Sequence, residues 1–62
     1  MDFSVSNHGS IFLLEPHTHA AFDWVAEHLP AEALTFGDAV VVEHHFISDI
    51  VTGIQADGLG VA

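Results

Sequence analysis

The chain has 62 residues with no lysine, arginine or cysteine, and its nine aspartates and glutamates give a formal net charge of −9 at pH 7. Without fixed cations it cannot release counterions from a nucleic-acid backbone, bind anionic lipid through a basic patch or form a Schiff base. The absence of cysteine excludes disulfides. We therefore expect neither nucleic acid nor a membrane as a direct partner.

Half of the residues are hydrophobic, which argues against disorder in spite of the high charge. A chain this short is near the lower size limit for a stable single core, so we expect one domain over residues 1–62. It has no basic amino-terminal region and no apolar run approaching ~20 residues. These features predict a cytoplasmic location.

Residues 3–14 predict a β-hairpin whose turn spans residues 7–9, with Gly9 in a left-handed conformation. The expected register pairs Val5 with Ile11 and Phe3 with Leu13. These four side chains would share one face of the hairpin, with Phe12 and Leu14 on the other.

A helix is predicted to follow, with Thr18 as its N-cap and Pro30 stopping it after Leu29. Helical spacing selects four residues to face the sheet: Ala21, Phe22, Val25 and Leu29. Trp24 lies beside this stripe and is expected to be half-buried.

Residues 33–42 predict a second hairpin, in which Gly37 suits the first position of a type II′ turn. The run of three valines at 40–42 predicts a central strand buried on both faces.

A second helix is expected from about His44 to Asp57. Gly58 fits the left-handed position of a Schellman motif, which would fold Leu59 onto Ile54. Gly53 inside this helix indicates close packing.

The predicted fold class is therefore α+β, with element order ββαββα. We expect a four-stranded, mainly antiparallel sheet with two helices on one face. The order of the strands in the sheet stays open.

Four segments have a family resemblance that covers nearly the whole chain: 7–11, 24–30 (WVAEHLP), 41–46 (VVEHHF) and 49–59 (DIVTGIQADGL). Together they resemble short uncharacterised bacterial proteins that are often associated with prophages. Those proteins usually carry some Lys or Arg, which this chain lacks. The group has no established activity, so the resemblance implies only a phage-type accessory or inhibitor protein.

Histidines are the candidate metal ligands, namely His17, His19 and His44. Their spacing is poor for chelation, because side chains at 17 and 19 diverge at a helix start and the adjacent 44 and 45 would point about 100° apart on a helix. Solvated or capping histidines are the simpler interpretation. We expect no cofactor.

Glu43 and His44 are the most enzyme-like pair, since a carboxylate beside an imidazole can act as a general base. No nucleophile or oxyanion motif accompanies them. We interpret Glu43 as favouring the second helix through its dipole and His44 as a cap. The sequence predicts no enzyme.

An acidic outer face of the two helices is the candidate partner-binding surface, formed by Asp23, Glu27, Asp49 and Asp57. Such a surface could mimic nucleic-acid phosphates and occupy the basic groove of a nuclease or DNA-binding protein. A solubilising face for a very apolar chain is the simpler interpretation.

The surplus of apolar side chains predicts a homodimer, since aromatic residues anchor interfaces. The interface candidates are Phe12, Leu14, Trp24 and Phe36. The leading functional hypothesis is a small acidic protein-interaction module, with a phage-type inhibitor of a basic partner as its sharpest version. The alternatives are a structural homo-oligomer and a histidine-based metal binder.

Overall fold

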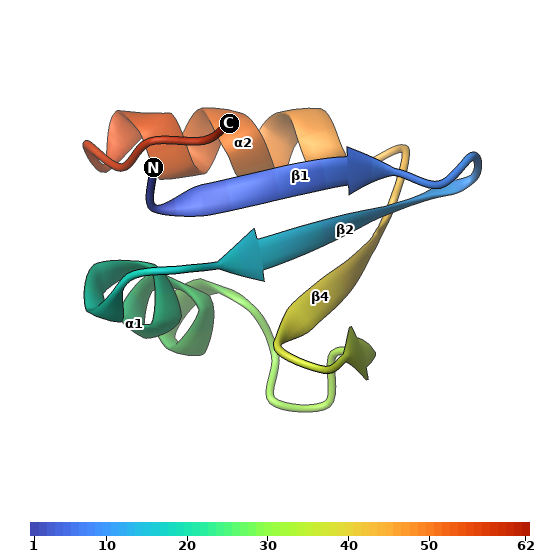
Figure 1. The fold of residues 1–62 in the computed structure, drawn as a ribbon, viewed down its shortest axis with the longest axis horizontal. Helices are drawn as coiled ribbons and strands as arrows, with labels where there is room; N and C mark the ends of the chain where they lie inside the picture. Colours follow the sequence, from blue (N-terminus) through green and yellow to red (C-terminus); the bar gives the residue numbers. More distant parts are fainter.

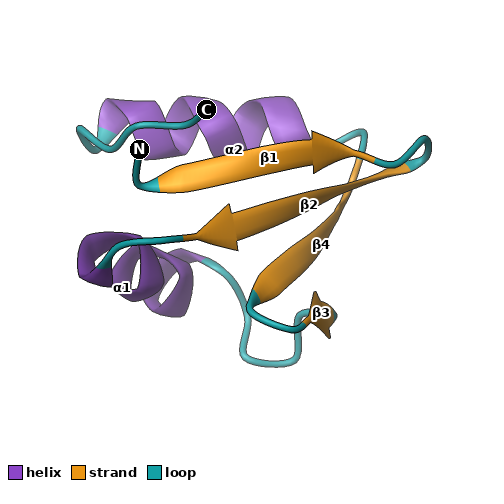
Figure 2. Cartoon of the chain, viewed as in Figure 1, coloured by secondary structure: helices purple, strands orange, loops and turns teal.

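A computed structural model describes all residues from 1 to 62 and shows one sheet with two helices (Figures 1 and 2). The elements are β1 (Phe3–Asn7), β2 (Ile11–Pro16), α1 (His19–His28), β3 (Thr35–Phe36), β4 (Ala39–Glu43) and α2 (Ile47–Ala56). The strand order is β1-β2-β4-β3, and every neighbouring pair is antiparallel. The predicted α+β class and ββαββα order are confirmed.

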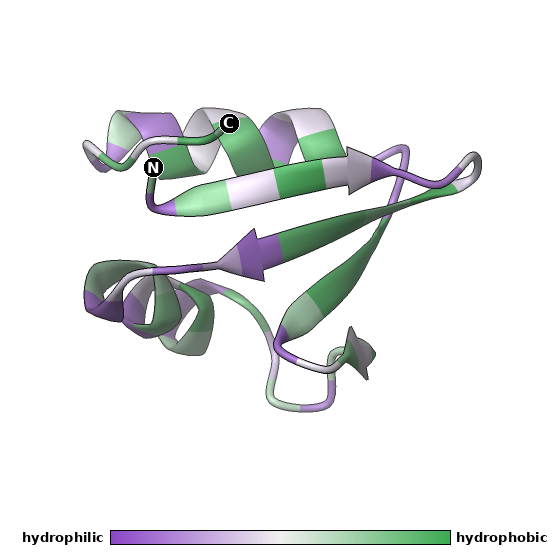
Figure 3. Cartoon of the chain, in the orientation of Figure 1, coloured by the Kyte–Doolittle hydropathy of each residue, from purple (hydrophilic) through white to green (hydrophobic).

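Both helices pack on the same face of the sheet. The buried cluster combines strand and helix residues, namely Phe3, Leu14, Val40 and Val42 with Ala21, Trp24 and Ile54. The strand members all lie on one face, because pairing places Leu14 opposite Val40 and side chains alternate along each strand. Figure 3 shows hydrophobic residues along most of β2 and β4 and alternating with polar residues along β1. The opposite face of the sheet carries no helix.

The first hairpin forms, but its predicted register is wrong. Val5 pairs with Leu14 instead of Ile11, and Phe3 pairs with Pro16 instead of Leu13. A shift of three residues is odd, so it turns the second strand over and places Leu14 on the helix-covered face. The longer loop lets all of β1 pair with residues 12–16 and buries Pro16 with Phe3, whereas the three-residue loop would place residues 14–16 beyond Phe3, the first residue of β1.

Helix α1 starts as predicted, because the Thr18 hydroxyl accepts a hydrogen bond from the Ala21 N–H at 3.1 Å. Its buried face differs from the expectation. Trp24 is only 7% exposed, whereas Phe22 is 46% exposed. The larger indole ring occupies the core, and it packs against Phe3 in a T-shaped arrangement with ring centroids 6.0 Å apart.

The second hairpin has the predicted two-residue turn, since Phe36 pairs with Ala39. Gly37 has φ +63° and no non-glycine residue has positive φ, which fits type II′. The expectation that the valine run is buried on both faces is wrong. Val41 is partly exposed on the uncovered face, because no second layer packs there.

Helix α2 begins later than predicted, with Phe46 as its N-cap and without a side-chain cap. Its end is as predicted. The Leu59 N–H donates to the Ile54 carbonyl and the Gly58 N–H to that of Gln55, with φ +84° at Gly58. These two bonds make a Schellman motif.

The carboxyl-terminal residues return to β1 and lie beside it (Figure 1). The Phe3 N–H donates to the Gly60 carbonyl at 3.0 Å, and the Ala62 N–H donates to the Phe3 carbonyl at 2.9 Å. This pairing covers part of the outer edge of β1. Neither helix has the length and hydrophobicity that crossing a membrane requires.

Candidate functional site

Three of the four predicted acidic-face residues surround one depression on the helical side of the molecule. Asp23 and Glu27 come from α1, and Asp57 is the C-cap of α2. The depression has a volume of about 480 Å³ and is lined by Ala20, Asp23, Trp24, Glu27, His28, Asp57 and Leu59. The helices bring these carboxylates together although Asp57 is 30 residues from Glu27 and 34 from Asp23 in the chain. We name this surface the acidic depression.

Trp24 holds Asp57 in place in the lining of the acidic depression. The indole Nε1–H donates a hydrogen bond to Asp57 Oδ2 at 2.7 Å. The imidazole of His28 stacks on the indole, with ring centroids 4.3 Å apart. Asp57 therefore has a fixed orientation, although its side chain is half-exposed.

The hydrogen bonds of His28 determine which of its nitrogens faces the carboxylate. Nδ1 lies 3.0 Å from the Trp24 carbonyl oxygen. Because a carbonyl only accepts, Nδ1 carries the hydrogen. Nε2 then faces Asp57 Oδ2 at 3.5 Å, and it becomes a cationic partner only when the ring is protonated.

The acidic depression has no fixed positive charge. His28 with Asp57 is the single pair of opposite ionisable groups within 4.0 Å in the protein, and both side chains are close to half-exposed. Asp23 and Glu27 are one turn apart on α1, so their charges repel each other. A cation from outside the chain would relieve this repulsion.

Asp49, the fourth predicted residue, does not line the acidic depression. It lies in the first turn of α2. A negative charge at this position interacts favourably with the helix dipole, which gives Asp49 a role in the helix itself.

The candidate metal ligands are separated. No group of three or more His, Asp or Glu side chains is arranged to hold a metal ion. His17 Nε2 lies 2.7 Å from Ser4 Oγ, and His44 Nδ1 lies 3.2 Å from the Ser10 carbonyl oxygen. His19 is the first residue of α1.

Two expectations about His44 are wrong because α2 begins at Ile47. His44 lies in the turn before the helix, so it does not cap it and binds Ser10 instead. In this turn the rings of His44 and His45 lie against each other, with centroids 4.0 Å apart and planes 39° apart, instead of diverging.

The predicted interface residues lie in different environments. Leu14 is fully buried and Trp24 is 7% exposed, so both belong to the core of the protomer and are removed from the list of interface candidates. Phe12 is partly buried. Phe36 is 73% exposed and lies over a depression on the uncovered sheet face, together with His8, Ile11, Leu13 and Val41.

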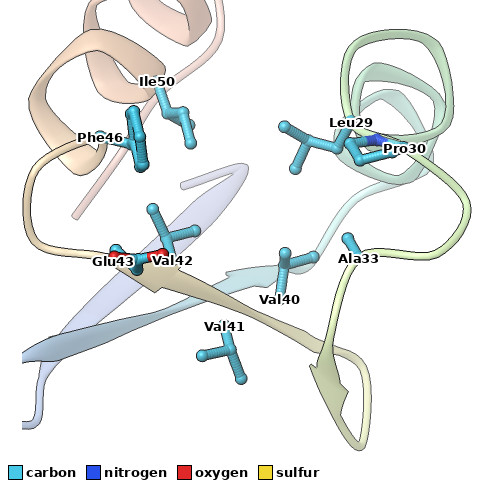
Figure 4. Close-up of a pocket in the computed structure, with 9 residues that line it drawn as sticks. All are labelled: Leu29, Pro30, Ala33, Val40, Val41, Val42, Glu43, Phe46 and Ile50. Carbon is cyan, nitrogen blue, oxygen red and sulfur yellow. The ribbon is translucent and has the colours of Figure 1, made fainter.

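A second apolar feature, which the sequence did not indicate, lies between the helices (Figure 4). It has a volume of about 240 Å³ and is lined by Leu29, Pro30, Ala33, Val40, Val41, Val42, Glu43, Phe46 and Ile50. In Figure 4 the side chains of Val40 and Val42 point up between Leu29 on one side and Phe46 and Ile50 on the other, whereas Val41 points away. We name it the inter-helix groove.

Comparisons with family models, curated proteins and solved structures find no match. The site is therefore interpreted from its own geometry. Sequence reasoning did not select His28, and it did not predict that the residues lining the inter-helix groove form one surface. Two signals were present. His28 follows Trp24 by four residues, and Phe46 belongs to the apolar face that helical spacing predicts for the second helix, together with Ile47, Ile50, Val51 and Ile54.

Proposed function

We propose that this protein is a small acidic interaction module that binds a basic protein partner through the acidic depression. The observation that carries the proposal is the gathering of Asp23, Glu27 and Asp57 around one depression, with only a histidine to balance them. Carboxylates arranged in this way favour lysine and arginine side chains of a partner and speed its association at low salt.

The sharpest form of the proposal is an inhibitor that occupies the nucleic-acid groove of its partner. The net charge of −9 and the lack of any Lys or Arg support it, because such grooves are lined by basic residues that bind phosphates. In this role the carboxylates of the acidic depression take the place of phosphates. No catalytic step is needed.

The test is affinity capture from the native host, eluted with a salt gradient and identified by mass spectrometry. The informative variant combines Asp23→Asn with Glu27→Gln, and its matched control combines Glu15→Gln with Glu32→Gln. Both variants have a net charge of −7, but only the first alters the acidic depression.

We expect the wild type and the control to retain a basic nuclease or DNA-binding protein that moderate salt releases, and the first variant to lose it. Recovery of the protein alone, or equal loss in both variants, would refute the proposal.

A second candidate function is a structural homo-oligomer. It is favoured by the uncovered sheet face, where Phe36 is 73% exposed beside Ile11, Leu13 and Val41. Sedimentation equilibrium separates the two candidates. A dimer held by this face would persist in high salt and would dissociate with Phe36→Ser, whereas the electrostatic complex would weaken with salt.

A further inference from the structure

The inter-helix groove exists because α1 and α2 diverge along their length. They are close near Trp24, where a Cβ placed on Gly53 would be 3.6 Å from the indole Cζ2. Toward the end of α1 and the start of α2 the helices separate, and Leu29 faces Phe46 and Ile50 across the gap (Figure 4). Val40 and Val42 form the floor.

The size and chemistry of the inter-helix groove fit one large apolar side chain. Its volume is about 240 Å³, and its lining is almost entirely aliphatic and aromatic. For comparison, an apolar cavity of about 150 Å³ is large enough to bind benzene. Phe46 on its rim is 56% exposed, so apolar surface remains in contact with water when the groove is empty.

The inter-helix groove and the acidic depression lie on one seam between the helices. On α1, Trp24 and His28 line the acidic depression and the next residue, Leu29, lines the groove. On α2, Ile50 lines the groove and Asp57 the depression, with Gly53 between them. One ligand segment lying along this seam would meet both surfaces.

Charge decides what kind of segment can lie there. Glu43 lines the inter-helix groove itself. Glu27 lies two residues before Leu29, which lines the groove on the α1 side. A second copy of this chain brings another −9 and no Lys or Arg to compensate, so repulsion opposes it. A segment with lysine or arginine beside its apolar residue is attracted instead.

We infer that the inter-helix groove is the anchor site for a single large apolar side chain of a basic partner segment, whose neighbouring lysines or arginines contact the acidic depression. The inference rests on the proposed function and adds the apolar half of the recognised motif. Anchors of this kind, seated in an apolar pocket, carry a large share of binding energy at protein interfaces.

The test uses two synthetic lysine-rich peptides that differ only at one central position, phenylalanine in one and serine in the other. Binding is measured by calorimetry to the wild type and to three variants. Phe46→Ser removes the rim of the groove, and Ala33→Leu fills it. Phe22→Ser is the matched control, because Phe22 is an exposed phenylalanine of α1 that lines neither surface.

We expect the phenylalanine peptide to bind the wild type and the Phe22→Ser variant at least tenfold more tightly than the serine peptide. Phe46→Ser and Ala33→Leu should each abolish that tenfold preference while the serine peptide binds as before. Circular dichroism of each variant checks that it is folded. Phe46→Ser enlarges the groove and Ala33→Leu fills it, so a shared loss of the preference would point to the groove itself.

The other outcomes overturn the inference in distinguishable ways. Equal, salt-sensitive binding of both peptides would reject the groove as an anchor site and leave the proposed function standing. If neither peptide bound the wild type, both the anchor site and the proposed function would be rejected. Sedimentation as a dimer that Phe46→Ser dissociates would assign the groove to a second copy of the chain.

Discussion

Asp2 accepts a hydrogen bond from the backbone N–H of Gly60 at its Oδ2 atom, over a distance of 2.9 Å. Its Oδ1 atom accepts a second bond from the Thr18 hydroxyl at 2.7 Å. One carboxylate thus joins the amino-terminal strand, the cap of α1 and the carboxyl-terminal segment. The bond from Gly60, and after it the bond from Thr18, lower the pKa of Asp2 below its ordinary value of 3.8.

The first prediction concerns the acid sensitivity of this junction. Because the pKa of Asp2 is lower in the folded than in the unfolded chain, its contribution to stability is complete above pH 3.8 and is lost as pH falls through the folded value. The Asp2→Asn variant should therefore be less stable than the wild type at neutral pH, and the difference in their free energies of unfolding should disappear in acid. Urea unfolding between pH 7 and pH 2 measures this.

Asp38→Asn is the control for Asp2→Asn, since Asp38 lies in the β3–β4 turn and makes no side-chain hydrogen bond in the structure. A constant difference between Asp2→Asn and the wild type across the whole pH range would contradict the prediction.

The second prediction is that Gly53→Ala stabilises the protein by about 0.5–1 kcal/mol. Glycine inside a helix costs conformational entropy of this size relative to alanine. The structure has room for the methyl group, because its nearest neighbour would be Trp24 Cζ2 at 3.6 Å, an ordinary contact distance. Thermal unfolding measures the change. Gly58→Ala should lower the melting temperature instead, since φ is +84° at Gly58. If Gly53→Ala were destabilising, α1 and α2 would have to pack more closely than the structure shows.

The third prediction tests the register of the first hairpin. Leu14 is fully buried beneath the helices, whereas Leu13 is only partly buried on the uncovered face. Leu14→Ala should cost about 2–5 kcal/mol, a large part of the stability of so small a domain, and Leu13→Ala should cost clearly less. Urea unfolding of both variants gives the comparison. A larger loss of stability for Leu13→Ala than for Leu14→Ala would support the register expected from the sequence.

The fourth prediction is that added salt stabilises the protein. The nine carboxylates are opposed by no Lys or Arg, so most charge interactions within the chain are repulsive, and salt screens them over a Debye length of about 8–10 Å. The melting temperature should rise between 10 mM and 500 mM NaCl. The variant that combines Asp23→Asn with Glu27→Gln should have a higher melting temperature at 10 mM NaCl and a smaller increase with salt, because it lacks the i, i+4 repulsion between these two residues. A melting temperature that falls with salt would mean that attractive pairs dominate.

Local sequence determined the order of the elements and three of their ends and turns, although not the start of α2. Thr18 begins α1, Gly37 makes a type II′ turn and Gly58 ends α2, each as predicted. These features depend on backbone conformations and hydrogen bonds between residues a few positions apart. Their physical cause is contained in a short segment, so a short segment predicts them.

Tertiary packing decided the register, the core and the site. The sequence allows either Leu13 or Leu14 to face inward, and the choice depends on how far β2 pairs with β1 and on which face the helices cover. Tertiary packing also decided the burial of Trp24, which helical spacing alone placed beside the apolar stripe of its helix. Its ring is buried because α2 lies beside it, a contact between residues far apart in the chain.

The charge of −9 was fixed by composition, and it led us to expect neither nucleic acid nor anionic lipid as a direct partner. Composition did not determine where that charge gathers. Asp57 joins Asp23 and Glu27 only because the two helices converge near Trp24, and the inter-helix groove opens only because they diverge beyond it. Both surfaces arise from the angle between two helices, which is set by side-chain packing over the sheet and not by any local pattern.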